Sequence, residues 1–74
     1  MKSEEIKRIR EKFGMDREDL ARLLCLAGYR SMMHIELGTR NPSKLAIRLL
    51  RYLDSLSKTK AMALIEELNR HEPK

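Results

Sequence analysis

Three glycines and the sequence Asn41-Pro42-Ser43 interrupt this chain at short intervals. Between the interruptions, apolar residues recur three and four positions apart, which is the pattern of amphipathic helices. No segment of convincing length alternates apolar and polar residues as a strand would. We therefore predict an all-α fold with five helices. The expected helices lie between Ser3 and Gly14 and at about residues 17–25, 29–37, 44–56 and 59–71.

Residues that favour helix N-termini precede these segments. Ser3 is followed by two glutamates, and an N-cap oxygen followed by acids suits the free N–H groups and the dipole of a helix start. Asp16 has Asp19 three residues later, which is a variant of the capping box. The candidate caps of the last two helices are Ser43, Ser57 and Thr59.

The chain is short, since its 74 residues suffice for one domain, 1–74. A domain this small buries only about 60% of its unfolded-chain surface, so its stability is marginal. Cys25 is the only cysteine, which excludes an intrachain disulfide and fits a reducing, cytoplasmic setting. No apolar run approaches the ~20 residues of a membrane span, and the acidic N-terminus lacks the apolar core of a secretory signal.

Positive charge is concentrated in the middle of the chain. The formal net charge is +5, and most of the excess falls within residues 28–52. There, Glu36 is the only acid against five basic residues. These are Arg30, Arg40, Lys44, Arg48 and Arg51. A local basic surface of this kind is expected for phosphate binding, although an ordinary solvated face is the competing interpretation.

The chain reads Ile6-Lys7-Arg8-Ile9-Arg10-Glu11-Lys12-Phe13-Gly14, then Asp16-Arg17-Glu18-Asp19-Leu20-Ala21-Arg22-Leu23-Leu24, and later Ile35-Glu36-Leu37-Gly38-Thr39-Arg40-Asn41-Pro42-Ser43. In this order and spacing, the segments resemble the Cro/CI-type helix-turn-helix family, also called the xenobiotic-response-element family. The resemblance covers about residues 4–56. It implies a lambda-repressor-like domain with a helix-turn-helix at about Asp16–Leu37, whose second helix lies in the DNA major groove.

The resemblance also implies which residues contact DNA. Met32 and Ile35 would anchor the recognition helix, about 29–37, to the core. The residues expected to read bases are Tyr29, Arg30 and His34, with Met33 at the flank. The residues expected near phosphates are Arg17, Ser31, Arg40, Asn41 and Lys44.

The chain departs from the common family pattern between the two helices of the motif. The segment Leu24–Glu36 is one residue longer than usual, so we expect an insertion in the turn. The glycine often found there is replaced by Cys25, and Gly28 comes later. The resemblance further implies a structural pair between Arg10 and Glu36, which would tie the first helix to the end of the recognition helix.

Neither catalysis nor metal binding is expected. The sequence has no glycine-rich phosphate loop and no nucleophile with a paired base. His34 and His71 lack a cysteine or carboxylate cluster at ligand spacing. Cys25 is expected to be a small packing residue. We therefore predict no enzyme activity, no cofactor and no small-molecule ligand.

A homodimer is expected, because two copies related by a two-fold axis read an inverted repeat about one helical turn apart. The helix at about 59–71 is expected to close the core and to dimerise, since its apolar residues do not fit one narrow stripe. The expected interface residues are Leu53, Leu56, Met62, Leu64, Ile65 and Leu68.

The function that follows is an autoregulatory transcriptional repressor in a bacterial or phage-infected cell. The stretch Arg40–Leu50 resembles a subgroup of this family that is common in phages and mobile elements. The subgroup includes anti-CRISPR-associated regulators, which implies control of an anti-CRISPR operon. The alternative is an antitoxin that binds a protein toxin as well as its own promoter. RNA binding is disfavoured, because the chain lacks an aromatic stacking surface.

Overall fold

The computed structural model describes residues 1–73, and every element in that range is a helix. The helices are α1 (Ser3–Lys12), α2 (Arg17–Leu23), α3 (Tyr29–Glu36), α4 (Lys44–Ser55) and α5 (Lys58–Arg70). The all-α prediction is therefore confirmed, and the observed ends fall within two residues of the expected ones. No helix in this range is long and apolar enough to cross a membrane.

Side-chain caps define the start of three helices. Asp16 and Asp19 form a reciprocal capping box, in which the Asp19 N–H donates to Asp16 Oδ1 at 2.8 Å. Ser43 caps α4 and Ser57 caps α5 through one hydrogen bond each, which the serine side chain accepts from the N–H of Ala46 and of Lys60. The prediction that Ser3 caps α1 was wrong. Ser3 lies inside the helix because the Lys2 carbonyl already accepts the first helical hydrogen bonds, and two first-turn glutamates face the positive end of the dipole.

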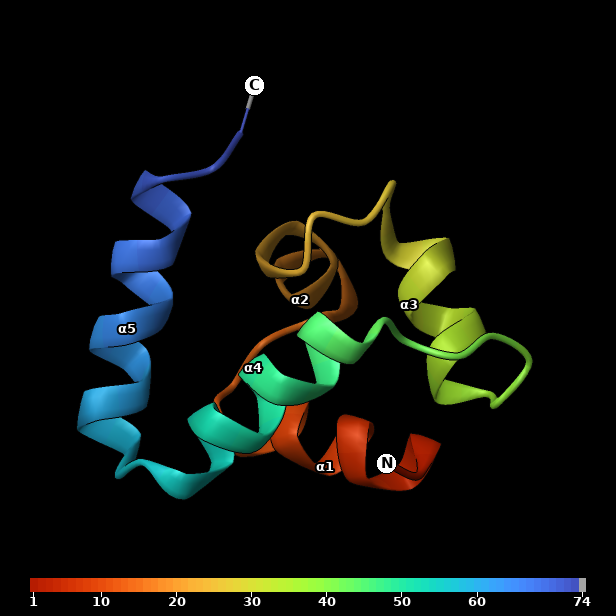
Figure 1. Ribbon diagram of the computed structural model, residues 1–74, viewed down its shortest axis with the longest axis horizontal. Helices are drawn as coiled ribbons and strands as arrows, with labels where there is room; N and C mark the ends of the chain where they lie inside the picture. Colours follow the sequence, from red (N-terminus) through yellow and green to blue (C-terminus); the bar gives the residue numbers. More distant parts are fainter. Residues whose placement is uncertain (74) are drawn as a thin grey trace.

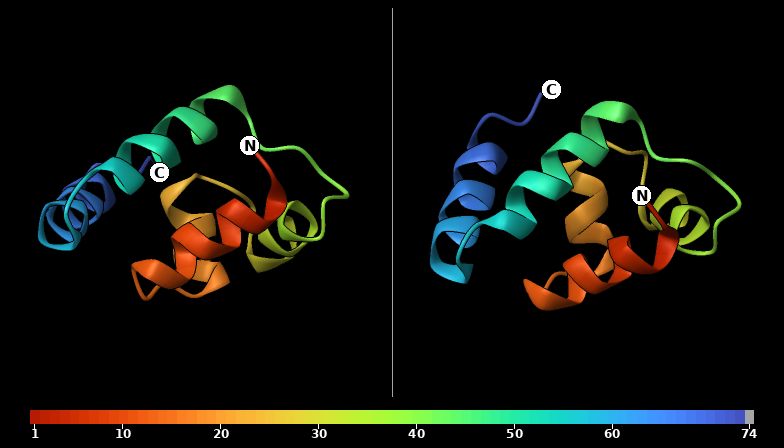
Figure 2. Two further views of the ribbon diagram at one scale, coloured as in Figure 1. Left: turned by 90° about the horizontal axis from the view of Figure 1, so that it is seen from below. Right: turned by 60° about the horizontal axis from the view of Figure 1, so that its bottom comes forward.

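The core lies between α1, α2 and α3 and is covered by α4 (Figure 1). Helix α3 packs against both α2 and α1, and α5 packs against α2. The left view of Figure 2 shows α4 along one face of the molecule and α1 along the opposite face. The largest fully buried side chains are Ile6, Ile9, Phe13, Leu20, Met32, Leu50 and Leu53.

The turn between α2 and α3 takes its left-handed residue from an unexpected position. Cys25 has a φ of 57°, whereas Gly28 has an extended backbone that any residue adopts. The N–H of Leu26 then donates to Ala21 O at 2.8 Å. Cys25 is exposed, so the prediction that it packs in the interior was wrong. Its left-handed conformation directly after the C-cap of α2 turns the side chain away from the core.

An ion-pair cluster joins the end of α4 to α1. Asp54 Oδ2 lies 3.0 Å from Arg8 Nη2, and Asp54 Oδ1 lies 3.1 Å from Lys12 Nζ. Hydrogen bonds from Arg8 and then from Lys12 hold the pKa of Asp54 below its ordinary value of 3.8. The cluster therefore favours the ionised carboxylate in the folded state and fixes how α4 lies on the core.

We predict that Asp54→Asn lowers the midpoint of urea unfolding at pH 7. A carboxylate with a lowered folded-state pKa stabilises the fold above its unfolded pKa, and this contribution is lost as the pH falls through the folded value. The difference between wild type and variant should therefore shrink from pH 5 downwards and vanish in strong acid. A difference that is independent of pH would contradict this role.

We predict that Cys25→Gly stabilises the fold by up to about 1 kcal/mol. A left-handed conformation costs an L-residue roughly 1–2 kcal/mol, and glycine removes that cost while adding a smaller entropy loss. Gly28→Ala is the matched control and should be tolerated, because a Cβ there meets no atom within 4 Å. Chemical unfolding checks both variants. If Gly28→Ala were the strongly destabilising change, the turn would be wrongly placed.

Candidate nucleic-acid interface

Helix α3 turns one face into the core and leaves the other in solvent. Met32 and Ile35 are buried, as the sequence predicted, and they fix the rotation of the helix. Tyr29, Arg30 and His34 are exposed on the opposite face. Ser31 and Met33 are half-buried. The three residues expected to read bases are thus together on one accessible face.

The segment after α3 folds back on the end of the helix. Gly38 has a φ of 81°, a left-handed conformation that glycine adopts at no steric cost. The N–H groups of Thr39 and Arg40 both donate to His34 O, at 3.0 and 3.2 Å. These bonds hold the chain next to α3. Arg40, Asn41 and Lys44 follow and are all exposed.

His34 is oriented by Thr39. The Thr39 hydroxyl lies 3.1 Å from His34 O and 3.2 Å from His34 Nδ1, within hydrogen-bond distance of both. His34 O also accepts from the N–H groups of Thr39 and Arg40. Thr39 therefore positions the imidazole ring, and the tautomer of the ring sets which of its nitrogens donates.

A buried carboxylate ties α3 to α1 and α2. Glu36 accepts two hydrogen bonds from Arg10, at 2.9 and 3.1 Å, which is the structural pair that the resemblance implied. The Arg10 guanidinium also donates to Met15 O at 3.0 Å. The Glu36 side chain is only 2% exposed. This bidentate pair fixes the end of α3 against the first helix.

Arg17 shares the same carboxylate. Its Nε lies 3.6 Å from Glu36 Oε1 and has no hydrogen-bond partner in the described chain. The side chain is 38% exposed, and it lines an open groove with Asp16, Glu18 and Tyr29. Arg17, which was expected near a phosphate, therefore already has an internal role that the sequence did not indicate.

Five basic residues of the central segment have no acidic partner within residues 1–73. The ion pairs in this range involve cations of α1, α2 and the end of α5. The unpaired residues are Arg30, Arg40, Lys44, Arg48 and Arg51, and each of them is exposed. The positive charge predicted from the sequence is therefore available to an external anion.

The expected dimer residues are divided between core and surface. Leu53 and Ile65 are buried within the monomer, so placing them in an interface was wrong. They face inward because α4 and α5 close the core together with Leu50 and Ala61. Leu56, Leu64 and Leu68 pack at the edge of the core, and Met62 is exposed.

The sequence analysis missed the exposed apolar residues of α4. Leu45 is 71% exposed and Tyr52 is 56% exposed. Apolar residues follow one another closely in this helix, so composition alone does not separate its exposed leucines from its buried ones. A helical projection that started from the spacing of Ala46, Leu50 and Leu53 would have placed Leu45 outside it.

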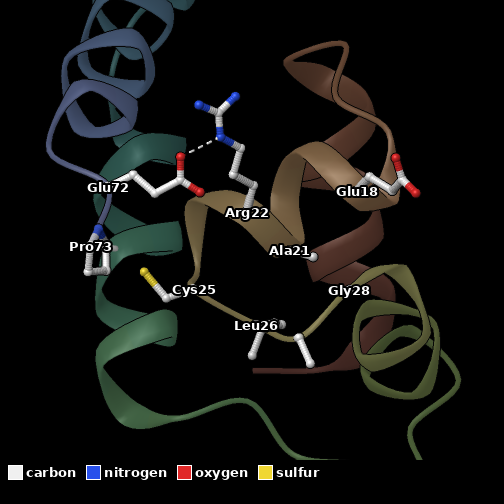
Figure 3. Close-up of a pocket in the computed structure, with 9 residues that line it drawn as sticks. Glu18, Ala21, Arg22, Cys25, Leu26, Gly28, Glu72 and Pro73 are labelled. Carbon is white, nitrogen blue, oxygen red and sulfur yellow. Dashed lines mark hydrogen bonds and ion pairs between the residues drawn. The ribbon is translucent and has the colours of Figure 1, made fainter.

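A separate pocket lies between α2, the turn and the segment after α5. Its lining residues include Glu18, Arg22, Cys25, Glu72 and Pro73. Arg22 Nε donates to Glu72 Oε2 at 2.8 Å across its edge (Figure 3). No histidine lines the pocket. Within residues 1–73, no three His, Cys, Asp or Glu side chains gather where they could hold a metal ion.

Comparison with known proteins found no matching family model, curated protein or solved structure. The functional argument therefore depends on the arrangement described above. That arrangement has an anchored α3 with an exposed polar face, followed by a basic loop and the basic start of α4.

We predict that Arg10→Met destabilises the fold by about 3 kcal/mol, because the buried Glu36 carboxylate loses both of its hydrogen bonds and keeps only Arg17, whose Nε lies 3.6 Å away without a hydrogen bond. Arg22→Met is a matched control, since its pair with Glu72 is exposed and should cost less than about 1 kcal/mol. Urea unfolding followed by circular dichroism measures both. Equal losses in the two variants would contradict the special role of Glu36.

Proposed function

We propose that this chain is a sequence-specific, double-stranded DNA-binding transcriptional repressor of lambda-repressor-like type. In this proposal, α2 and α3 form the helix-turn-helix and α3 enters the major groove. The observation that carries it is the exposed α3 face, which is followed by the exposed cations Arg40 and Lys44, neither of which has an ion-pair partner within residues 1–73.

The α3 residues would supply base readout. Arg30 is exposed, and its guanidinium can bind guanine O6 and N7 in a bidentate manner. His34 is exposed, and its imidazole can donate or accept a hydrogen bond at a base edge or a phosphate. Tyr29 would contribute its hydroxyl, with Met33 providing apolar contact at the edge.

The phosphate contacts would come from both sides of α3. Arg40, Asn41 and Lys44 follow the helix and would track the DNA backbone, and Ser31 lies near its start. Arg17 would reach a phosphate from the first turn of α2 while its Nε remains beside Glu36. These contacts would supply affinity without sequence information, because each one releases counterions from DNA.

The biological setting is part of the same proposal. A homodimer would bind an inverted-repeat operator in the cytoplasm of a bacterial or phage-infected cell. Occupancy would follow protein concentration, which makes the repressor autoregulatory. The resemblance of Arg40–Leu50 to anti-CRISPR-associated regulators supports an anti-CRISPR operon as the regulated unit.

An antitoxin is the alternative proposal, in which α5 also binds a protein toxin. We rank it second because the apolar residues of α5 are largely used inside the monomer. Ile65 is buried and Leu64 and Leu68 pack at the core edge, which leaves Met62 as its exposed large apolar residue.

Selection of bound sites from random double-stranded DNA tests the main proposal. We predict one enriched motif, and Arg30→Ala should relax preference at one base pair at a cost of about 1–3 kcal/mol. Lys44→Ala should instead weaken all sequences alike and reduce the salt slope by about one unit. Lys60→Ala, at an exposed cation on α5, is the matched control and should leave binding unchanged.

Two outcomes would contradict the proposal. Absence of any enriched motif would remove sequence-specific binding. An unchanged motif in Arg30→Ala, with folding intact, would show that α3 does not read bases in the register described.

A further inference from the structure

The outermost line of α4 consists of cations. Lys44, Arg48 and Arg51 are exposed and follow one another at intervals of four and three residues, so they lie on one side of the helix. The buried residues Leu50 and Leu53 lie on the opposite side and face the core. The three cations, here named the cation ridge, therefore point away from the body of the molecule.

No acid neutralises the cation ridge. Asp54 is the only acid of α4, and Arg8 and Lys12 of α1 bind it at 3.0 and 3.1 Å. None of the three ridge residues forms an ion pair within residues 1–73. Like charges three and four residues apart disfavour a helix, and a cation in its first turn opposes the helix dipole. The ridge therefore lowers the stability of α4, and an anionic partner would offset this effect.

A shallow groove accompanies the cation ridge and gives it apolar area. The three cations line this groove together with Ile47, which is half-buried. Tyr52 follows Arg48 by one helical turn and is 56% exposed. Phosphate groups have no apolar part to place against these side chains, whereas a protein segment that carries carboxylates has one. Arginine and tyrosine are also enriched in interfaces between proteins.

The cation ridge lies away from the helix that is proposed to read DNA. Helix α3 packs against α1 and α2, and the left view of Figure 2 shows α4 along one face of the molecule. Lys44 lies at the end of the ridge next to the loop after α3, so it stays available to the DNA backbone. Arg48 and Arg51 lie farther along α4, and no contact of the proposed function uses them.

We propose that the cation ridge and its groove bind an acidic, amphipathic helix of another protein, whose carboxylates recur at the spacing of the ridge. Arg48 and Arg51 each bind a carboxylate of this helix, for which the planar guanidinium is suited. Ile47 contacts an apolar side chain between the carboxylates. This interaction goes beyond the proposed function, because the partner binds whether or not DNA is present.

Fluorescence anisotropy of a labelled synthetic peptide tests the interface with the full chain. The peptide is an amphipathic helix with glutamates at the spacing of the ridge and leucines beside them. A second peptide carries glutamine in place of each glutamate. We expect only the glutamate peptide to bind, with an affinity that falls as NaCl is added, because salt screens exposed charges.

Two double variants locate the binding surface. Arg48→Ala combined with Arg51→Ala should weaken binding of the glutamate peptide about 10-fold, because two arginine–carboxylate pairs are lost. Lys7→Ala combined with Lys60→Ala removes two exposed cations of α1 and α5. It is the matched control and should leave peptide binding unchanged.

Four results would overturn the proposal. The glutamate peptide could fail to bind, or the glutamine peptide could bind equally well, which would make the contact apolar. The two double variants could weaken binding equally, which would reduce it to net charge. The ridge variant could lose as much affinity for a DNA duplex of random sequence as for the peptide, which would assign Arg48 and Arg51 to the DNA backbone. The DNA selection experiment is independent, so either proposal can fail alone.

Discussion

The arrangement of this domain depends on one buried carboxylate. Glu36 lies at the end of α3, where it accepts two hydrogen bonds from Arg10 of α1 and has Arg17 of α2 at 3.6 Å. Burying a carboxylate without a cation beside it costs several kcal/mol of folding free energy, so the native fold must place Arg10 and Arg17 next to Glu36. Three helices are thereby fixed at one point. The rotation of α3 is then completed by Met32 and Ile35, which enter the core from the same helix.

The parts of the fold that were predictable are those that depend on local chemistry. Asp16, Ser43 and Ser57 cap helices because their side chains meet backbone N–H groups only three residues away. The turn after α2 was not predictable, because no local rule makes Cys25 left-handed when Gly28 is nearby. Its conformation follows from the long-range demand that Leu26 pack against the core and that α3 begin in a register that buries Met32.

The candidate site shows the same division. The resemblance implied an outer face with Tyr29, Arg30 and His34, and these residues are exposed because Met32 and Ile35 turn the other side of α3 into the core. The ion pair between Arg17 and Glu36, the second pair of this carboxylate, could not be predicted, because nineteen positions separate the two residues in the sequence. The orientation of His34 by Thr39 was equally hidden, because it requires the chain to turn back at Gly38.

The small size of the domain explains why α4 both covers the core and holds the loop after α3. Because the domain has few helices, α4 must cover the core, which it does with Ala46, Leu50 and Leu53. In the chain, α4 comes directly after the loop that follows α3. The short segment 37–43 therefore connects the end of α3 to a helix that the core holds in place, and the Ser43 cap fixes where that helix begins. The loop that holds Arg40 and Asn41 is thus anchored at both ends, at α3 by the N–H groups that donate to His34 O and at α4 by Ser43.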